Sequence, residues 1–349
     1  MNLTDTEIRR LRVASQLLYR TGRRQSSVDI VTTLLAVQAQ DIGAAPLALR
    51  ARTRGLTAAD VAAARDEGAI VRAWGPRGTL HLIARDDLEW LTGLILPTSL
   101  PLVMRRLRQE GVTGDVNDLV AAVDRAMVGA GPLTKGALGE RLAAQGVPAS
   151  GQGIVYMAFL GAIHGRVVLG PDAGNRPTYV YTADWLGAPL GMAPDREPAL
   201  AELARRYLRA HAPAAPEDLS AWSKLSLRDA REAFRLAGAD GSLVEVRHRD
   251  RLLWRPRGRA PAVRQPAPLT LLPALDEYLL GWQDRDHAVP AAYARRVHPG
   301  GGMVKAVVVD DGVVVGTWRP GDLSVELFED TGTDHAVQQE LADVERFLA

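Results

Sequence analysis

The chain has 349 residues, 47% of them hydrophobic, and its 42 Lys and Arg nearly balance 41 Asp and Glu, for a formal net charge of +1. This length predicts two or three folding units, and the balanced charge gives by itself no reason to expect a polyanionic partner. There is no cysteine, which excludes disulfides, thiolate metal sites, iron–sulfur clusters and thiol nucleophiles.

Lysine is scarce among the basic residues, since only Lys135, Lys224 and Lys305 are not arginine. A GC-rich genome is enough to explain this bias, but it leaves few amines for Schiff-base chemistry. The first twenty residues are charged and amphipathic, unlike a secretory signal, and no apolar stretch reaches transmembrane length. We therefore expect a cytoplasmic protein without a membrane segment.

Residues 1–100 show helical patterns followed by a β-hairpin. Thr4 and Glu7 have the spacing of a capping box, and apolar residues then recur at helical intervals. Further helices are expected before Gly68. Two β-rich runs on either side of a Gly-Pro-Arg-Gly turn come next, which predicts a hairpin over residues 70–83.

The same order returns twice along the chain. Residues 101–190 contain three helical segments and a predicted hairpin over 167–181, and residues 191–265 contain three more with a hairpin over 243–254. Helices followed by a two-stranded hairpin are typical of the winged helix, a variant of the DNA-binding helix-turn-helix. Three repeats at similar spacing favour a tandem array that binds nucleic acid.

The composition changes from about residue 266. Asp311 and Gly312 join two apolar strands in a pattern that predicts a tight hairpin, and a further strand and a terminal helix follow. We therefore predict an α+β protein with three tandem winged-helix modules and a C-terminal β-barrel-like domain. The predicted domains are residues 1–100, 101–190, 191–265 and 266–349.

Arginines gather in the third hairpin and after it. Seven lie between residues 247 and 264, against the single acid Asp250. Arginine-rich wings suit contact with DNA phosphates, although solvated arginines without a ligand are the alternative. The first hairpin also has two interpretations: a wing that faces DNA, or a turn that packs a tryptophan. The predicted DNA contacts are Arg77, His81, Arg247, Arg249 and Arg251.

No phosphate-binding loop, dinucleotide fingerprint or hydrolase motif is present, and the seven histidines show no metal-ligand spacing, so we expect neither metal nor cofactor. Acids concentrate between Leu275 and His287. This stretch, with Glu277 and His287, could supply a general base, but a structural network of Asp–Arg and Tyr hydrogen bonds is favoured. Supporting or structural roles are expected for Asp41, Asp276, Tyr278, Asp284 and Arg285.

Two glutamines, Gln38 and Gln40, follow an apolar helical run and precede a predicted chain break. Residues i and i+2 of a helix point about 200° apart, so the two amides can act together only in an extended segment. A neutral amide can hold a water or stabilise a developing charge, but it cannot take up a proton near neutral pH. On the residues alone, a surface or capping role is the simpler interpretation.

Four motifs resemble those of the AlkZ-type winged-helix DNA glycosylases. They are Gln38-Ala39-Gln40, "RGTLHL" from Arg77, "LSAWSKL" from Leu219 and "LLPALDEYLLGWQDR" from Leu271. The resemblance covers nearly the whole chain. Its family motif is glutamine, aliphatic residue, glutamine, which Ala39 fits. A related group has aspartate at the third position and is a worse match, because residue 40 is not Asp.

The resemblance implies tandem winged helices with a C-terminal β-barrel and a monofunctional DNA glycosylase that excises bulky or crosslinking N7-alkylguanine adducts. Family members include enzymes that protect actinomycetes from their own genotoxic antibiotics. Alkylation at N7 makes the base a cationic leaving group, so strong acid catalysis is unnecessary. Gln38 and Gln40 would then position a water at C1′ and steady the oxocarbenium-like sugar.

The partner implied by the resemblance is double-stranded DNA carrying alkylated guanine, bound by a monomer that associates with the nucleoid when on DNA. Two alternatives are open at this point. A non-catalytic winged-helix regulator would have the same modules, and a drug-sequestering protein would bind free toxin in a cleft.

Overall fold

The computed structural model describes residues 2–20, 24–174, 176–258, 265–330 and 332–349. The chain forms two compact units. Unit 1 comprises Met1–Ala62 and Leu200–Ala349, and unit 2 comprises Ala63–Ala199. Unit 2 is therefore continuous in sequence, whereas unit 1 is built from both ends of the chain. The division into four domains stays a prediction.

Unit 1 begins with helices whose ends are set by local side chains. α1 (Asp5–Ser15) starts at a capping box, in which the Thr4 hydroxyl accepts the Glu7 N–H and the Glu7 carboxylate accepts the Thr4 N–H. α2 (Ser27–Leu34) has the same arrangement, with Ser26 as its cap. The capping box predicted for the first helix is confirmed.

The helical part of unit 1 resumes at α11 and ends in a hairpin. α11 (Arg196–His211), α12 (Pro216–Ser223) and α13 (Leu227–Ala237) precede β7 (Leu243–His248) and β8 (Arg251–Pro256). β7 and β8 pair antiparallel along their whole length, which confirms the hairpin predicted over 243–254. A small core joins this hairpin to the N-terminus; it contains Leu3, Ile8, Ala215, Val246 and Leu253.

The C-terminal part of unit 1 is an antiparallel sheet of order β12-β11-β10-β9. Its strands are β9 (Thr270–Leu272), β10 (Val307–Asp310), β11 (Val313–Arg319) and β12 (Ser324–Leu327). The predicted barrel-like domain is wrong for the described residues, because this sheet is open. Four strands of three to seven residues are too few to close on themselves, and α16 (Asp334–Leu348) packs against β9.

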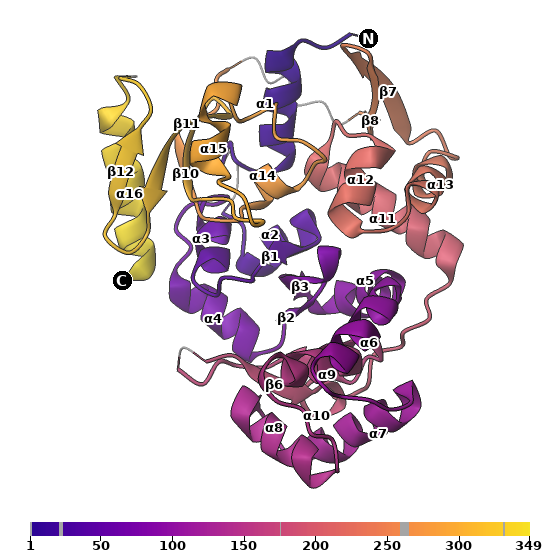
Figure 1. Cartoon of the computed structure of the whole chain (residues 1–349). Helices are drawn as coiled ribbons and strands as arrows, with labels where there is room; N and C mark the ends of the chain where they lie inside the picture. Colours follow the sequence, from indigo (N-terminus) through magenta and orange to yellow (C-terminus); the bar gives the residue numbers. More distant parts are fainter. Residues whose placement is uncertain (1, 21–23, 175, 259–264, 331) are drawn as a thin grey trace. The chain divides into compact units, whose positions relative to one another are not determined.

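The hairpin between β10 and β11 is the one that Asp311 and Gly312 predict. Both residues have positive φ, +43° and +78°, as a two-residue turn between twisted strands requires. Gly312 is also needed for space, because a Cβ there would lie 2.7 Å from the side chains of Arg9 and Val13. Helix α1, indigo in Figure 1, thus packs against this turn.

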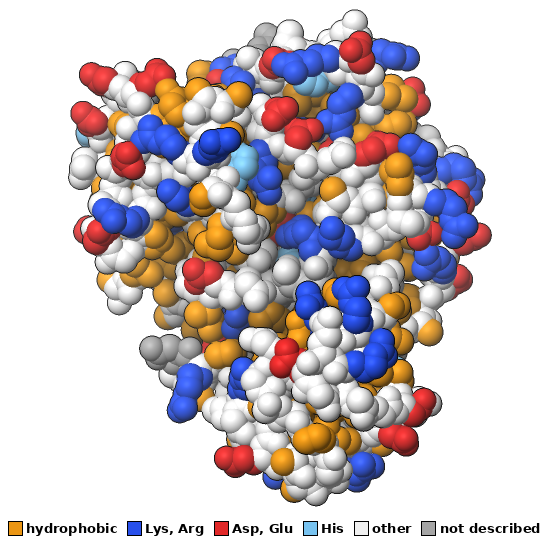
Figure 2. Space-filling view, in the orientation of Figure 1, with side chains coloured by type: hydrophobic (Ala, Val, Ile, Leu, Met, Phe, Trp, Pro, Cys, Tyr) orange, Lys and Arg blue, Asp and Glu red, His pale blue; other side chains and the backbone are white. Residues whose placement is uncertain are grey.

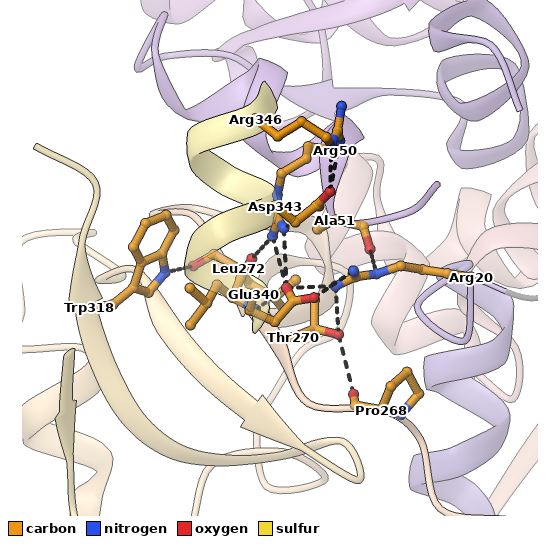
Figure 3. A network of polar contacts seen from close by, with 11 residues as sticks. Arg20, Arg50, Ala51, Pro268, Thr270, Leu272, Trp318, Glu340, Asp343 and Arg346 are labelled. Carbon is orange, nitrogen blue, oxygen red and sulfur yellow. Dashed lines mark hydrogen bonds and ion pairs between the residues drawn. The ribbon is translucent and has the colours of Figure 1, made fainter. Parts of the chain in front are cut away.

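A buried ionic network fastens α16 to the rest of unit 1 (Figure 3). The Glu340 carboxylate accepts hydrogen bonds from Arg20 (2.6 and 2.8 Å), from Arg50 (3.2 Å) and from the backbone N–H of Leu271 (3.1 Å). Arg50 also pairs with Asp343 at 2.9 Å. Arg50 ends α3 (Ala44–Arg50), so the network joins α3, β9 and α16.

Unit 2 combines helices with one antiparallel sheet. Within the unit the strand order is β3-β2-β5-β6-β4, and β2 meets β5 at Arg72 and Leu169. The hairpins predicted over 70–83 and 167–181 are confirmed as β2–β3 and β5–β6, and they share this sheet. The strands are β2 (Ile70–Trp74), β3 (Leu80–Ala84), β4 (Leu133–Thr134), β5 (Val167–Leu169) and β6 (Thr178–Tyr181).

The helices of unit 2 include two, α5 and α6, that the sequence patterns did not predict. α5 directly follows the first hairpin, and α6 follows α5 after a short turn. The helices are α5 (Arg85–Ile95), α6 (Leu100–Gln109), α7 (Val116–Met127), α8 (Lys135–Ala144), α9 (Gly151–Ile163) and α10 (Thr182–Leu186), with α4 (Ala58–Asp66) leading in from unit 1. Across the described ranges of both units, no helix has the length and apolar character needed to cross a membrane.

Candidate active site

The Gln38–Gln40 segment leaves helical geometry, as its sequence predicted. α2 ends, Leu35 turns the chain with a φ of +72°, and the two residues of β1 (Val37–Gln38) are extended. Gln38 exposes 8% of its surface and Ala39 exposes 1%, whereas Gln40 is exposed. The segment therefore has a buried side and an accessible side.

Hydrogen bonds fix the direction of the Gln38 amide. Its side-chain Oε1 accepts the backbone N–H of Gln40 at 2.8 Å. Because a backbone N–H can only donate, the side-chain atom that it meets must be the oxygen, and the amide orientation follows from this bond. The backbone N–H of Gln38 in turn donates to Glu277 Oε1 at 3.1 Å.

Glu277 is a buried acceptor for two donors. It exposes 1% of its surface, and its second oxygen, Oε2, accepts the indole N–H of Trp222 at 3.1 Å. Trp222 is itself fully buried and packs against the rings of Tyr207 (5.5 Å) and His211 (5.7 Å). The "LSAWSKL" and "LDEYLL" motifs thus meet beneath Gln38, although they lie far from it in sequence.

Asp276 belongs to a fully buried ion pair. Both of its oxygens accept from the Arg52 guanidinium at 2.8 Å, and Oδ1 also accepts the N–H of Tyr278 at the start of α14 (Glu277–Leu280). Arg52 donates further to the Ala48 carbonyl (2.7 Å) and to Gln16 Oε1 (2.8 Å). This clamp joins α14 to the chain just after α3.

The other predicted supporting residues make local or packing contacts. Burial raises the pKa of the Tyr278 phenol far above its ordinary value, and the phenol donates to the Gly312 carbonyl at 2.7 Å. Asp41 accepts backbone N–H groups around the start of α3. The carbonyl of Arg285 accepts two backbone N–H groups of the following turn. These contacts favour the structural role of this region.

His287, one of the general-base candidates, lies in an aromatic cluster. Its ring is 4.6 Å from that of Trp282 and 5.2 Å from that of Tyr278, between ring centroids. Burial, followed by the nearby charge of Arg12, lowers the pKa of His287 well below its ordinary value. A neutral, packed imidazole results, which favours a packing role.

Arg77 and His81 lie together in the first hairpin, in unit 2. Arg77 is half-buried with a φ of +61°, and its guanidinium is 3.3 Å from His81 Nε2. The other ring nitrogen of His81 lies 3.0 Å from the Thr79 carbonyl. Burial, and then the charge of Arg77, lowers the pKa of His81 well below its ordinary value. His81 is fully buried and neutral, so Arg77 is the better placed of the two for contact with an anion.

Arg247 and Arg249 are exposed on the third hairpin. The Arg249 guanidinium pairs with Asp5 at 2.7 Å, and both side chains are largely exposed. The Arg247 carbonyl accepts the Leu3 N–H at 2.8 Å. Figure 2 shows that basic and acidic side chains are interspersed over the face drawn, so the arginines do not form a uniform field there. Two more arginines of the predicted basic stretch, at 259 and 264, lie outside the described residues.

Arg251 differs from its neighbours because it has two acidic partners. It lies 3.2 Å from Asp218 and 3.2 Å from Asp284. The Asp218 side chain is fully buried and also approaches Arg12 at 4.0 Å. Arg251 and Asp284 therefore balance charge within unit 1, and removing Arg251 would disturb a buried carboxylate.

A network of Asp–Arg and Tyr hydrogen bonds was expected around Asp276, but the sequence did not identify its arginine partner. Arg50 and Arg52 are completely or almost completely buried, and only their position at the end of the apolar α3 pattern hints at this. Nothing in the sequence predicted that Trp222 and Glu277 contact each other. Within the described ranges, no group of three or more histidine, aspartate or glutamate side chains is placed to hold a metal ion.

Comparison with known proteins gives three findings. A family model described as DNA glycosylase AlkZ-like matches residues 31–347. The chain is 31% identical over 338 residues to an interstrand DNA cross-link repair glycosylase of Streptomyces sahachiroi, a match that covers 92% of this chain and 90% of that protein. The solved structure of the Streptomyces sahachiroi DNA glycosylase AlkZ is similar with a TM-score of 0.83 at 28% identity, over 99% of this chain and 97% of that one.

Proposed function

The chain belongs to the AlkZ-like family of DNA glycosylases, and on that premise we propose that it hydrolyses the N-glycosidic bond of bulky N7-alkylguanine adducts in DNA, including interstrand crosslinks. The product is an abasic site. The family membership confirms the resemblance that the four motifs indicated. The crosslink substrate rests on the name of the Streptomyces sahachiroi relative, and a role in self-resistance to a DNA-alkylating natural product rests on the resemblance alone.

The observation that carries this proposal is the non-helical, anchored Gln38-Ala39-Gln40 segment. Its backbone is tied to buried Glu277, and Gln40 is exposed. In the proposed mechanism the Gln40 amide oxygen accepts a hydrogen bond from the attacking water, and the Gln38 amide nitrogen helps to orient that water. The water attacks C1′ as the bond to the base breaks, and its proton passes to the solvent. Neither group needs to transfer a proton, because the N7-alkylated base leaves as a neutral molecule from a cation.

DNA binding is proposed to use the hairpins of three tandem winged helices. The three confirmed hairpins, each preceded by helices, support this arrangement. Arg77, Arg247 and Arg249 are the proposed phosphate contacts, since phosphate contacts position a protein on the duplex. The protein is proposed to act as a monomer in the cytoplasm on double-stranded DNA.

The test compares three DNA substrates in single-turnover reactions: one with N7-methylguanine, one with a bulky N7-guanine adduct and one with an N7-linked interstrand crosslink. Abasic sites are detected by alkaline cleavage. We expect excision of the bulky adduct and unhooking of the crosslink, and loss of both in the Gln38→Ala/Gln40→Ala variant. Excision restricted to N7-methylguanine would overturn the proposed substrate class.

A further inference from the structure

The backbone of the glutamine motif is held by a carboxylate from a second of the four motifs, the stretch that begins at Leu271. Glu277 Oε1 accepts the N–H of Gln38, and Gln38 Oε1 accepts the N–H of Gln40. These two bonds form a relay from a buried side chain to the exposed end of the motif. A shift of Glu277 would therefore change the placement of both amides.

We propose that Glu277 is a positioning residue for the glycosylase reaction, acting through the Gln38 backbone and held in place by Trp222. The inference rests on the proposed catalytic role of Gln38 and Gln40. It assigns Glu277 no contact with the substrate, and so differs from the alternative in which Glu277 is the general base.

The donors around Glu277 explain why a carboxylate occupies this position. Both oxygens face N–H groups, from Gln38 on one side and from the Trp222 indole on the other, each at 3.1 Å. A carboxylate has acceptors on both sides, whereas an amide has an oxygen on one side and two N–H donors on the other. The side-chain oxygen of a glutamine at 277 can therefore accept from one of the two N–H donors. Its own N–H group must then face the other donor, which is unfavourable.

This geometry makes opposite predictions for single and double substitutions. In Glu277→Gln, an N–H group must face either Gln38 or Trp222, so the motif or its support shifts. In Glu277→Gln with Trp222→Phe, the indole donor is gone and the amide oxygen is free to accept from Gln38. The second substitution should therefore restore part of the activity that the first removes, which two independent defects would not do.

The experiment measures single-turnover excision of a bulky N7-guanine adduct, DNA affinity and thermal stability for wild type, Glu277→Gln, Trp222→Phe and the double variant. We expect Glu277→Gln to lower the excision rate up to about 100-fold, the loss that a misplaced catalytic group causes. DNA affinity should stay within about twofold of wild type, since the interaction concerns the transition state. The double variant should be at least about fivefold faster than Glu277→Gln if the two donors compete as described.

Glu340→Gln is the matched control, because Glu340 is another buried glutamate of unit 1 with several donors. It should lower thermal stability and leave the excision rate near wild type. The proposal would be overturned if the double variant excised no faster than Glu277→Gln. It would also be overturned if Glu340→Gln, at the same thermal stability as Glu277→Gln, lost as much of the excision rate. If Gln38→Ala and Gln40→Ala are fully active while Glu277→Gln is not, the proposed role of the glutamines fails instead, and Glu277 is the general base.

Discussion

Gln40 is the residue whose replacement should most directly affect catalysis. We expect Gln40→Ala to lower the single-turnover excision rate on the order of 100-fold, as does loss of one hydrogen-bonding group in other active sites. DNA affinity should remain nearly unchanged, because the amide acts mainly in the transition state. Gln38→Ala also removes the acceptor for the Gln40 N–H, so the two losses should not add.

Gln338→Ala serves as the control for this series, since Gln338 is exposed on α16. It should excise at the wild-type rate. A folded Gln38→Ala/Gln40→Ala variant with undiminished activity would show that the motif is not catalytic.

At the residue scale, the family resemblance indicated Gln38 and Gln40 as the catalytic amides now proposed, but nothing in the sequence predicted how they are held. An extended segment was expected only if Gln38 and Gln40 act together, and the chain is extended at Val37–Gln38. The anchoring by Glu277 was not expected, because that hydrogen bond joins residues 239 positions apart. Pattern reasoning detects local periodicity, and a single hydrogen bond at this separation leaves no periodic signal.

Among the elements, the clamp between α14 and the end of α3 should be the most sensitive to substitution. Asp276→Ala leaves the fully buried guanidinium of Arg52 without its carboxylate, and we expect a loss of about 3–5 kcal/mol in the free energy of unfolding. Urea unfolding followed by circular dichroism measures this loss. Glu232→Ala, which breaks the exposed Glu232–Arg235 pair on α13, should leave the unfolding midpoint unchanged. Equal effects of the two substitutions would contradict the role of the clamp.

The attachment of α16 should depend on pH. Burial by itself would raise the pKa of Glu340, but the hydrogen bonds and charges of Arg20 and Arg50 outweigh burial and lower it below the ordinary value of 4.5. A carboxylate with a lowered pKa stabilises the fold above its unfolded-state pKa, and this stabilisation is lost as the pH falls through the folded-state pKa. The stability gap between wild type and Glu340→Gln should thus be largest near neutral pH and shrink below 4.5. A gap that is constant with pH in urea titrations would refute this assignment.

Some helices and turns are specified by neighbouring residues in the sequence, and others are not. Caps such as Thr4 with Glu7, and turns such as Asp311-Gly312, are specified by neighbouring residues and were predicted correctly. α5 was not predicted, although it follows β3 directly at Arg85. The barrel expectation failed because a run of predicted strands does not reveal whether their sheet closes, and strands as short as Thr270–Leu272 belong here to an open sheet.

For the whole molecule, DNA affinity should fall with salt through the exposed arginines. Replacing Arg247 and Arg249 by glutamine should reduce the slope of log K against log salt by about 0.9 for each DNA phosphate that is no longer neutralised. Arg251 is left intact because its removal would disturb buried Asp218. Arg319→Gln, an exposed arginine on β11, is the control and should keep the slope. An unchanged slope in the double variant would place the DNA-binding surface elsewhere.

The proposed reaction also predicts that no covalent intermediate forms between the protein and DNA. Water is the nucleophile, and the chain has only three lysines with which to form a Schiff base. Borohydride added during turnover should therefore trap no protein–DNA adduct, in contrast to a bifunctional lyase run in parallel. A trapped species that disappears in a lysine variant would show that the enzyme is not monofunctional.

Unit 1 is discontinuous in sequence, so its two segments are synthesised at different times. The ribosome delivers Gln38 early, but Glu277 emerges 239 residues later, and Glu340 follows Arg50 by 290. All of unit 2 is synthesised between these two segments. Its folding shortens the flexible chain that separates them and so lowers the entropic cost of bringing them together. The nascent chain therefore carries its glutamine motif for most of translation without the Glu277 contact, and a product stopped before α16 lacks the Glu340 carboxylate that joins Arg20, Arg50 and β9.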